Sequence, residues 1–160
     1  YCMTGWRLGY CGGPKEIIVG MNKIQSQSTT STSSITMAAA VEALNGNQDF
    51  IKVHNQQFLK RRDMVIEKLN NIPGIVCNTP QGAFYVYPSC AGCIGKKTPD
   101  GKTITSDENF MNYLLDSEGI AGVHGEAFGL SPYFRLSYAT DELTLNDACN
   151  RIMKACKKLI

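Results

Sequence analysis

The sequence predicts an α/β or α+β fold, in which helices pack against a mixed sheet. Apolar residues recur at helical spacing over residues 15–70, and short runs rich in aromatic and β-branched residues follow from residue 75 onward. Helices and strands then alternate to the end of the chain without an internal repeat. These three observations together are typical of a helical layer on a sheet.

The composition is that of an ordinary globular protein and excludes several classes of partner. The chain has 160 residues, 43% apolar and 19% charged, which suits one domain or one domain and part of another. A net charge of +2 with dispersed basic residues gives no basic stripe for nucleic acid, and no apolar run is long enough to cross a bilayer. We therefore expect neither nucleic acid nor a membrane as a partner.

The first part of the chain is predicted to hold two short helices. Glycines from Gly5 to Gly13 are typical of a short strand or a turn, and Pro14 suits the start of a helix over residues 15–25. Residues 26–34 are polar throughout and are either a flexible linker or a loop whose hydroxyl groups face a ligand or a partner subunit. The second helix is expected over residues 35–44.

A long helix is predicted over residues 49–70, because apolar residues line one face of it and Pro73-Gly74 ends it. A helix of this length can run from one subdomain into another, so the domain boundary is expected here. The predicted organisation is a first part over residues 1–46, a connecting helix over residues 47–73 and a small domain over residues 74–160.

The small domain is expected to contain four strands, an irregular loop over residues 91–105 and two helices. Aromatic and β-branched residues bounded by glycine or proline predict strands at residues 75–77, 83–87, 120–123 and 133–138. The first helix is capped by Ser106 and closes at Gly119. Its predicted buried residues are Phe110, Met111, Leu114 and Leu115. Those of the final helix are Leu145, Ala148, Cys149, Ile152 and Cys156.

The cysteines favour a reducing, cytoplasmic location and give one alternative function. There are seven, an odd number, and several occupy apolar periodic positions. Cys90 and Cys93 have the spacing of a zinc or redox pair, but Cys149 and Cys156 are spaced as one helix face rather than as a second ligand pair. We expect no metal site, and a non-catalytic module that uses Cys90 and Cys93 for metal or redox chemistry stays open as an alternative.

Two arginines are candidates for binding anions. Arg7 follows Thr4 in a glycine-rich turn, where a guanidinium can form two hydrogen bonds to a phosphate, although an ordinary surface arginine fits the same pattern. Arg135 lies in an apolar strand, where its charge needs a partner. That partner is either the carboxylate of an amino acid or an acidic residue of the protein, and the residues by themselves leave both alternatives open.

The first residues resemble a known enzyme family. The segment MTGWRLGY is similar to the one that follows the cofactor lysine in class I aminotransferases, which reads S-K-x-x-x-M-T-G-x-R-x-G. These enzymes have fold type I and depend on pyridoxal 5'-phosphate. The resemblance implies that the chain holds the small C-terminal domain and the last part of the large cofactor-binding domain. The Schiff-base lysine would lie two residues before Tyr1, so the resemblance assigns no catalytic residue here and implies that the chain alone is inactive.

Further segments resemble the bacterial aspartate aminotransferase branch of this family, in the same order. They are KIQSQSTTSTSSITMAAAVEALNG, PQGAFYVYPS, HGEAFG and FRLSYA. The likeness implies that Arg7 binds the cofactor phosphate and that Arg135 binds the α-carboxylate of the substrate. It also implies a cytoplasmic homodimer that transfers an amino group between L-aspartate and 2-oxoglutarate, with aromatic amino acids or prephenate as alternative substrates.

The chain departs from the family pattern at two places. The chain has Ser31-Thr32 where the family has Asn-Pro, and His124 replaces the proline of the P-G-x-x-F-G segment. Neither departure falls on Arg7 or Arg135, so the implied reaction class stands. The conformations of the two loops, and any role of Ser31, are left open.

Overall fold

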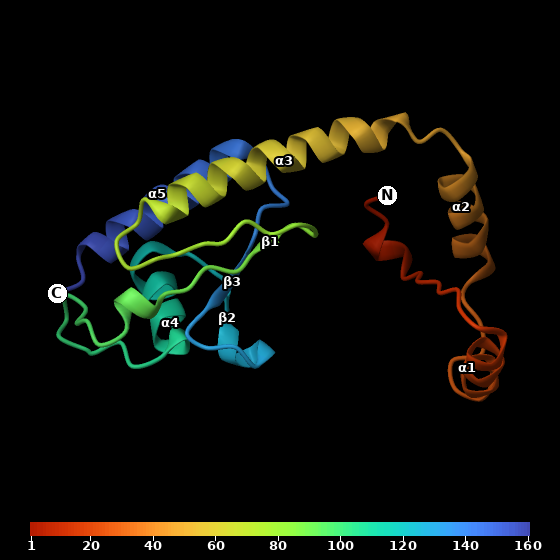
Figure 1. Ribbon diagram of the computed structural model, residues 1–160, viewed down its shortest axis with the longest axis horizontal. Coiled ribbons are helices and arrows are strands. Elements are labelled where there is room, and N and C mark those ends of the chain that lie inside the picture. The colour runs from red at the N-terminus through yellow and green to blue at the C-terminus, as the bar shows by residue number, and fades with distance from the viewer. The chain divides into compact units, whose positions relative to one another are not determined.

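The computed structural model describes residues 1–160 and divides them into two compact units (Figure 1). The first unit comprises Tyr1–Val53 and the second comprises His54–Ile160. The boundary falls within a single long helix, α3, which runs over Asp49–Asn70 as the sequence predicted. The three-part division expected from the sequence treats this helix as a segment of its own, and it stays a prediction.

Short helices make up the first unit before α3. They are η1 (Thr4–Trp6), α1 (Lys15–Gln27) and α2 (Ser34–Asn45). α1 begins directly after Pro14 as expected, but it extends past its predicted end, so the polar loop shrinks to residues 28–33. The extension has a local cause. The Ser28 hydroxyl donates to the Ile24 carbonyl oxygen at 3.0 Å, and so provides a partner for one of the carbonyl groups that the last helical turn leaves without one.

Thr36 is the one buried residue of the first unit. Its hydroxyl donates to the Trp6 carbonyl oxygen at 3.2 Å, which ties the first turn of α2 to η1. The large apolar side chains of α1 and α2 are half-buried or exposed. Taken by itself, this unit therefore has almost no core. No helix of the protein combines the length and apolarity that crossing a membrane requires.

The second unit packs helices against a small sheet (Figure 1). The strands are β1 (Tyr85–Val86), β2 (Val123–His124) and β3 (Phe134–Ser137), in the order β1-β3-β2. The helices are the C-terminal part of α3, α4 (Asp107–Glu118) and α5 (Glu142–Lys157). Two 3₁₀ turns, η2 (Ala91–Cys93) and η3 (Gly125–Phe128), complete the unit.

Both strand pairs are antiparallel, so the expectation of a mixed sheet is wrong. Parallel neighbours need a long crossover connection, and α4 does cross between β1 and β2. These two strands are not neighbours, however, because β3 lies between them and runs antiparallel to each.

The strands are shorter than the sequence predicted. The run at residues 75–77 makes only an isolated bridge, between Val76 and Ser89. β1 has 2 residues, because Ala83 adopts a left-handed backbone with φ 59° and Pro88 has no N–H to donate. β2 begins only at Val123, where the predicted strand ends.

The core lies between one face of the sheet and the helices. Val86 and Phe134 are fully buried, and the Phe134 ring lies 5.5 Å from that of Phe110 on α4. α5 contributes the face that the sequence predicted. Leu115 was expected in this core but is 50% exposed. It follows Leu114 on α4, and one residue further along a helix is rotated by about 100°.

Local signals fix both ends of α4. The Ser106 hydroxyl oxygen accepts the Asn109 N–H at 3.1 Å, which is the predicted N-cap. At the other end Gly119 is left-handed, with φ 64°, and its N–H donates to the Leu114 and Leu115 carbonyl oxygens.

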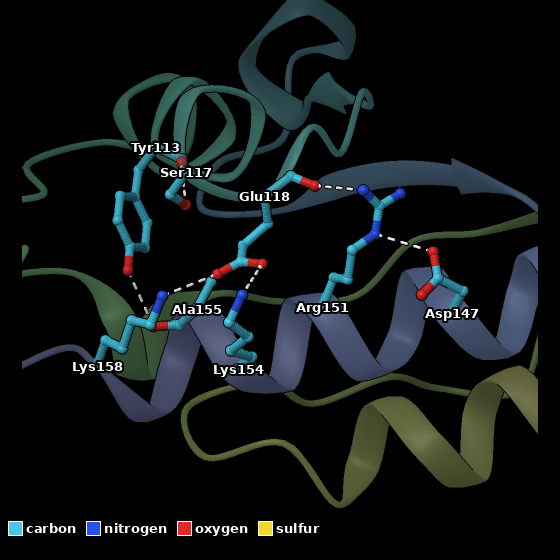
Figure 2. Close-up of polar contacts among 8 residues, drawn as sticks. All are labelled: Tyr113, Ser117, Glu118, Asp147, Arg151, Lys154, Ala155 and Lys158. Carbon is cyan, nitrogen blue, oxygen red and sulfur yellow. Dashed lines mark hydrogen bonds and ion pairs between the residues drawn. The ribbon is translucent and has the colours of Figure 1, made fainter.

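A buried carboxylate joins the end of α4 to α5 (Figure 2). The Glu118 side chain is only 3% exposed and accepts from Lys154 Nζ at 2.9 Å and from Lys158 Nζ at 3.0 Å. Arg151 Nη1 donates to the Glu118 carbonyl oxygen at 2.6 Å. Arg151 and Lys154 of α5, together with Lys158 directly after it, therefore hold the last residue of α4.

Candidate functional site

Arg135 lies on the face of the sheet that points away from the core. Its neighbours in β3, Phe134 and Leu136, pack in the core, and successive residues of a strand point to opposite faces. Tyr85 of β1 pairs with Ser137, two residues from Arg135, so it shares this outer face.

Two aromatic rings contact the guanidinium group of Arg135. Its Cζ lies 4.5 Å from the ring centroid of Tyr85 and 4.6 Å from that of Phe128 in η3. Cation–π contacts of this kind hold a guanidinium without using its N–H groups. None of the ion pairs of the protein involves Arg135, so the chain itself provides no acidic partner. The half-buried charge is therefore available to an external carboxylate.

Tyr87 supports the loop beside Arg135. Its ring stacks on that of Tyr133, with centroids 5.6 Å apart and an interplanar angle of 11°. Its hydroxyl donates to the carbonyl oxygens of Gly125, at 3.1 Å, and Leu130, at 3.4 Å. Burial, and then the nearby Asp107 carboxylate, raise the pKa of Tyr87, so the hydroxyl keeps its proton at neutral pH.

Asp107 is a residue of this region that the sequence did not reveal. Its side chain is fully buried at the start of α4. Oδ1 accepts the Glu108 N–H at 3.0 Å, and Oδ2 accepts the N–H groups of Glu126 at 3.1 Å and Tyr133 at 3.3 Å. The sequence showed an acidic residue in a first helical turn, which suits the helix dipole. Its loop partners are distant in the chain, so no local pattern pointed to them.

His124 occupies the position where the resembled family has proline. Its φ of −63° and ψ of 148° lie in the region to which a proline ring restricts the backbone. The histidine therefore keeps the entry to η3 in a conformation that a proline would also allow.

Arg7 lies in the first unit, directly after η1. Its backbone is left-handed, with φ 53° and ψ 44°, and its exposed side chain donates from Nη1 to the Thr4 carbonyl oxygen at 3.4 Å. With Trp6 it lines an open hollow of about 360 Å³. The other lining residues are Gln25, Thr29, Ser31, Thr32, Ser33 and Thr36.

This hollow presents hydrogen-bond donors and one positive charge. Its lining includes five hydroxyl groups and no carboxylate. Ser33 and Thr36 border the start of α2 at Ser34, and the first N–H groups of a helix lack partners within it. A guanidinium, hydroxyl groups and a helix N-terminus together suit a phosphate group. Ser31, whose role the sequence left open, lines the same hollow as Arg7.

Five of the seven cysteines form part of the core, whereas Cys2 and Cys11 are exposed. Cys90 and Cys93 are fully buried, and burial raises the pKa of Cys90 to about 12, so its thiol is neutral. All seven cysteines are free thiols. No group of three or more His, Cys, Asp or Glu side chains is placed to hold a metal ion.

Known proteins match this chain over nearly its whole length. The family model described as "Aminotransferase class I and II" matches residues 1–152. A probable aspartate/prephenate aminotransferase from Rhizobium leguminosarum bv. phaseoli is 57% identical over 156 residues, which are 98% of this chain and 39% of that protein.

Solved structures give the same result. The crystal structure of the aspartate aminotransferase from Rhizobium meliloti matches with a TM-score of 0.95 at 53% identity, over 100% of this chain and 40% of that one. An alanine aminotransferase from Pyrococcus furiosus matches with a TM-score of 0.81 at 28% identity, over 97% of this chain and 39% of that one. The chain therefore spans about 40% of the length of the relatives it matches.

Proposed function

The chain belongs to the class I and II aminotransferase family, and we therefore propose that it takes part in the transfer of an amino group between L-aspartate and 2-oxoglutarate. The observation that carries this proposal is the guanidinium of Arg135, which contacts two aromatic rings and has no acidic partner in the chain. A carboxylate matches the parallel N–H groups of a guanidinium. Every α-amino acid and every 2-oxo acid carries such a carboxylate, so Arg135 can hold both substrates.

We propose pyridoxal 5'-phosphate as the cofactor, with its phosphate in the hollow beside Arg7. The lining of this hollow, with one guanidinium, several hydroxyl groups and no carboxylate, fits a dianionic group. When bound, the cofactor supplies the electron sink for removal of the α-proton of the amino acid. The contribution of this chain is to bind, with Arg7 holding the phosphate and Arg135 orienting the substrate carboxylate.

Prephenate, or an aromatic amino acid, is a second candidate substrate. The relative from Rhizobium leguminosarum is named for both aspartate and prephenate. Tyr85 and Phe128 beside Arg135 also provide apolar surface that a ring-bearing substrate can contact. The carboxylate that Arg135 would bind is common to both classes, so this residue does not distinguish them.

We further propose that the enzyme is a cytoplasmic homodimer. The free state of all seven cysteines supports a reducing compartment. Exposed apolar side chains on α1 and α2, such as Ile24 and Val41, provide surface that association can cover.

A chimera tests the proposed reaction. Residues 1–160 would replace the aligned segment of the Rhizobium meliloti enzyme, whose structure they match so closely. We expect the chimera to convert L-aspartate and 2-oxoglutarate, and parallel assays with prephenate distinguish the two candidate substrates. A chimera that is folded by circular dichroism and binds the cofactor, yet converts neither substrate, would contradict the proposal.

The chimera also tests Arg135 itself. Arg135→Lys keeps the charge but loses the paired N–H groups, so we expect kcat/KM for L-aspartate to fall by about 10- to 100-fold. The matched control is Arg62→Lys, because Arg62 lies on α3 and pairs with Asp63 at 2.7 Å. The control should leave kcat/KM unchanged, and an equal effect of the two substitutions would argue against a carboxylate site at Arg135.

A further inference from the structure

We propose that Asp107 is a positioning residue for Arg135. The proposal rests on the proposed function, in which Arg135 binds the carboxylate of the substrate. Asp107 is buried at the start of α4 and holds the loop that carries Phe128. Through the ring of Phe128, this loop fixes the orientation of the Arg135 guanidinium.

Asp107 joins the two ends of the loop between η3 and β3. Its Oδ2 atom accepts the N–H of Glu126, at the start of η3, at 3.1 Å and that of Tyr133, just before β3, at 3.3 Å. The carboxylate is fully buried and forms no ion pair, so its partners are these N–H groups and that of Glu108. A buried carboxylate requires such donors, and the donors in turn require an acceptor.

The same loop determines where the Phe128 ring lies. Phe128 is 49% exposed, so core packing does not hold it; its ring meets that of Tyr87 edge-on, with centroids 6.3 Å apart, and its position otherwise depends on the loop backbone. Short hydrogen bonds close this backbone on itself. They run from the Gly129 N–H to the Glu126 oxygen, from the Leu130 N–H to the Gly125 oxygen and from the Gly125 N–H to the Tyr133 oxygen, at 2.9, 3.1 and 2.7 Å. Asp107 connects this closed loop to α4 and hence to the core.

The Phe128 ring in turn limits the orientation of Arg135. A guanidinium is planar and its N–H groups lie in its plane, so a ring contact with Cζ at 4.6 Å restricts the directions in which those groups can meet a carboxylate. Tyr85 provides the second contact from β1, and no hydrogen bond links Tyr85 to Asp107. Loss of the Asp107 carboxylate should therefore release one ring contact and keep the other.

The first test observes Arg135 directly and needs no substrate. Ring currents displace the NMR signal of an arginine Nε–H that lies against aromatic rings, and Arg135→Lys assigns that signal by removing it. In the 160-residue chain we expect Asp107→Ala to move the Arg135 signal toward those of the other arginines. Asp107→Asn keeps one acceptor oxygen and should move it less.

Ser106→Ala is the matched control for this test. It removes the cap of the same helix, where the Ser106 hydroxyl accepts the Asn109 N–H, but none of the bonds to the loop. We expect it to leave the Arg135 signal in place. An unchanged Arg135 signal in folded Asp107→Ala would overturn the proposal. Where Asp107→Ala fails to fold, the same comparison is made with Asp107→Leu, which is close to aspartate in shape and has no acceptor, and an unchanged signal there overturns the proposal equally.

Kinetics of the chimera give the second readout. A misplaced guanidinium should lower kcat/KM for L-aspartate by about 10- to 100-fold in Asp107→Ala, chiefly through a higher KM, whereas Ser106→Ala should not change it. A loss of kcat/KM with an unchanged Arg135 signal would mean a merely structural role and would overturn the proposal. If the unsubstituted chimera is inactive, the proposed reaction fails, and the NMR comparison still decides whether Asp107 positions Arg135.

Discussion

Among single residues, Gly125 has the least room for a side chain. A Cβ atom built there would clash with the Leu130 carbonyl oxygen and lie 2.8 Å from both the Tyr133 carbonyl oxygen and the Tyr87 hydroxyl. Two of these three neighbours are backbone atoms of a loop that hydrogen bonds close on itself. They cannot move aside as the end of a flexible side chain can, so the position accepts only glycine.

Gly125→Ala should therefore destabilise the protein. Overpacking of this kind lowers the free energy of unfolding by about 1–3 kcal/mol, and urea denaturation of the chain measures it. Gly82→Ala is the control, because no atom lies within 4 Å of its Cβ position. Equal stability of the two variants would show that the loop yields more easily than its hydrogen bonds suggest.

Some residues of the candidate site could be predicted from the sequence and others could not. Arg7 in a glycine-rich turn and Arg135 in an apolar strand stand out locally, and the family resemblance gave them roles that stay proposals. Asp107 did not stand out, because an acidic residue in a first helical turn is common and its partners in the loop, Glu126 and Tyr133, are brought near only by the fold.

For whole elements, local signals decided which boundaries could be predicted. α3 and α4 begin and end where the sequence indicated, since Ser106, Gly119 and Pro73-Gly74 act on the backbone next to them in the chain. The strands were predicted too long, because a strand extends only as far as its neighbour pairs with it. The left-handed Ala83 that limits β1 has no signal in its residue type.

The link between α4 and α5 depends on the charge of Glu118 (Figure 2). Hydrogen bonds from Lys154, and then from Lys158, hold the pKa of Glu118 below its usual value. A carboxylate whose pKa is lower in the folded state than in the unfolded state stabilises the fold above the unfolded value of about 4.3. That contribution is lost as the pH falls through the lower, folded value.

Glu118→Gln should accordingly be less stable than the unsubstituted chain at pH 7. The difference should shrink as the pH falls below about 4, because protonation then removes the same charge from Glu118. Urea denaturation at a series of pH values measures this dependence. Glu108→Gln on the same helix is the control, since Glu108 is exposed and forms no ion pair. A difference that does not vary with pH would rule out the charge as its cause.

At the scale of the whole molecule, the two units differ in how much they bury. The first has a single buried residue, Thr36, whereas the second contains the entire hydrophobic core. Amide protons exchange slowly where opening requires core packing to break. We therefore expect protection factors in α4 and α5 to exceed those in α1 and α2 by roughly 100-fold or more, in hydrogen exchange followed by mass spectrometry. Similar protection in both units would contradict this expectation.

Trp6 gives the protein an optical reporter for the first unit alone. It is the only tryptophan of the chain, and it lines the hollow next to Arg7, where its carbonyl oxygen accepts the Thr36 hydroxyl. Indole emission therefore originates from the surroundings of this hollow alone. Tyr85, Tyr87 and Tyr133 cluster near Arg135 in the other unit, which contains no tryptophan, so changes in that region do not enter the indole signal directly.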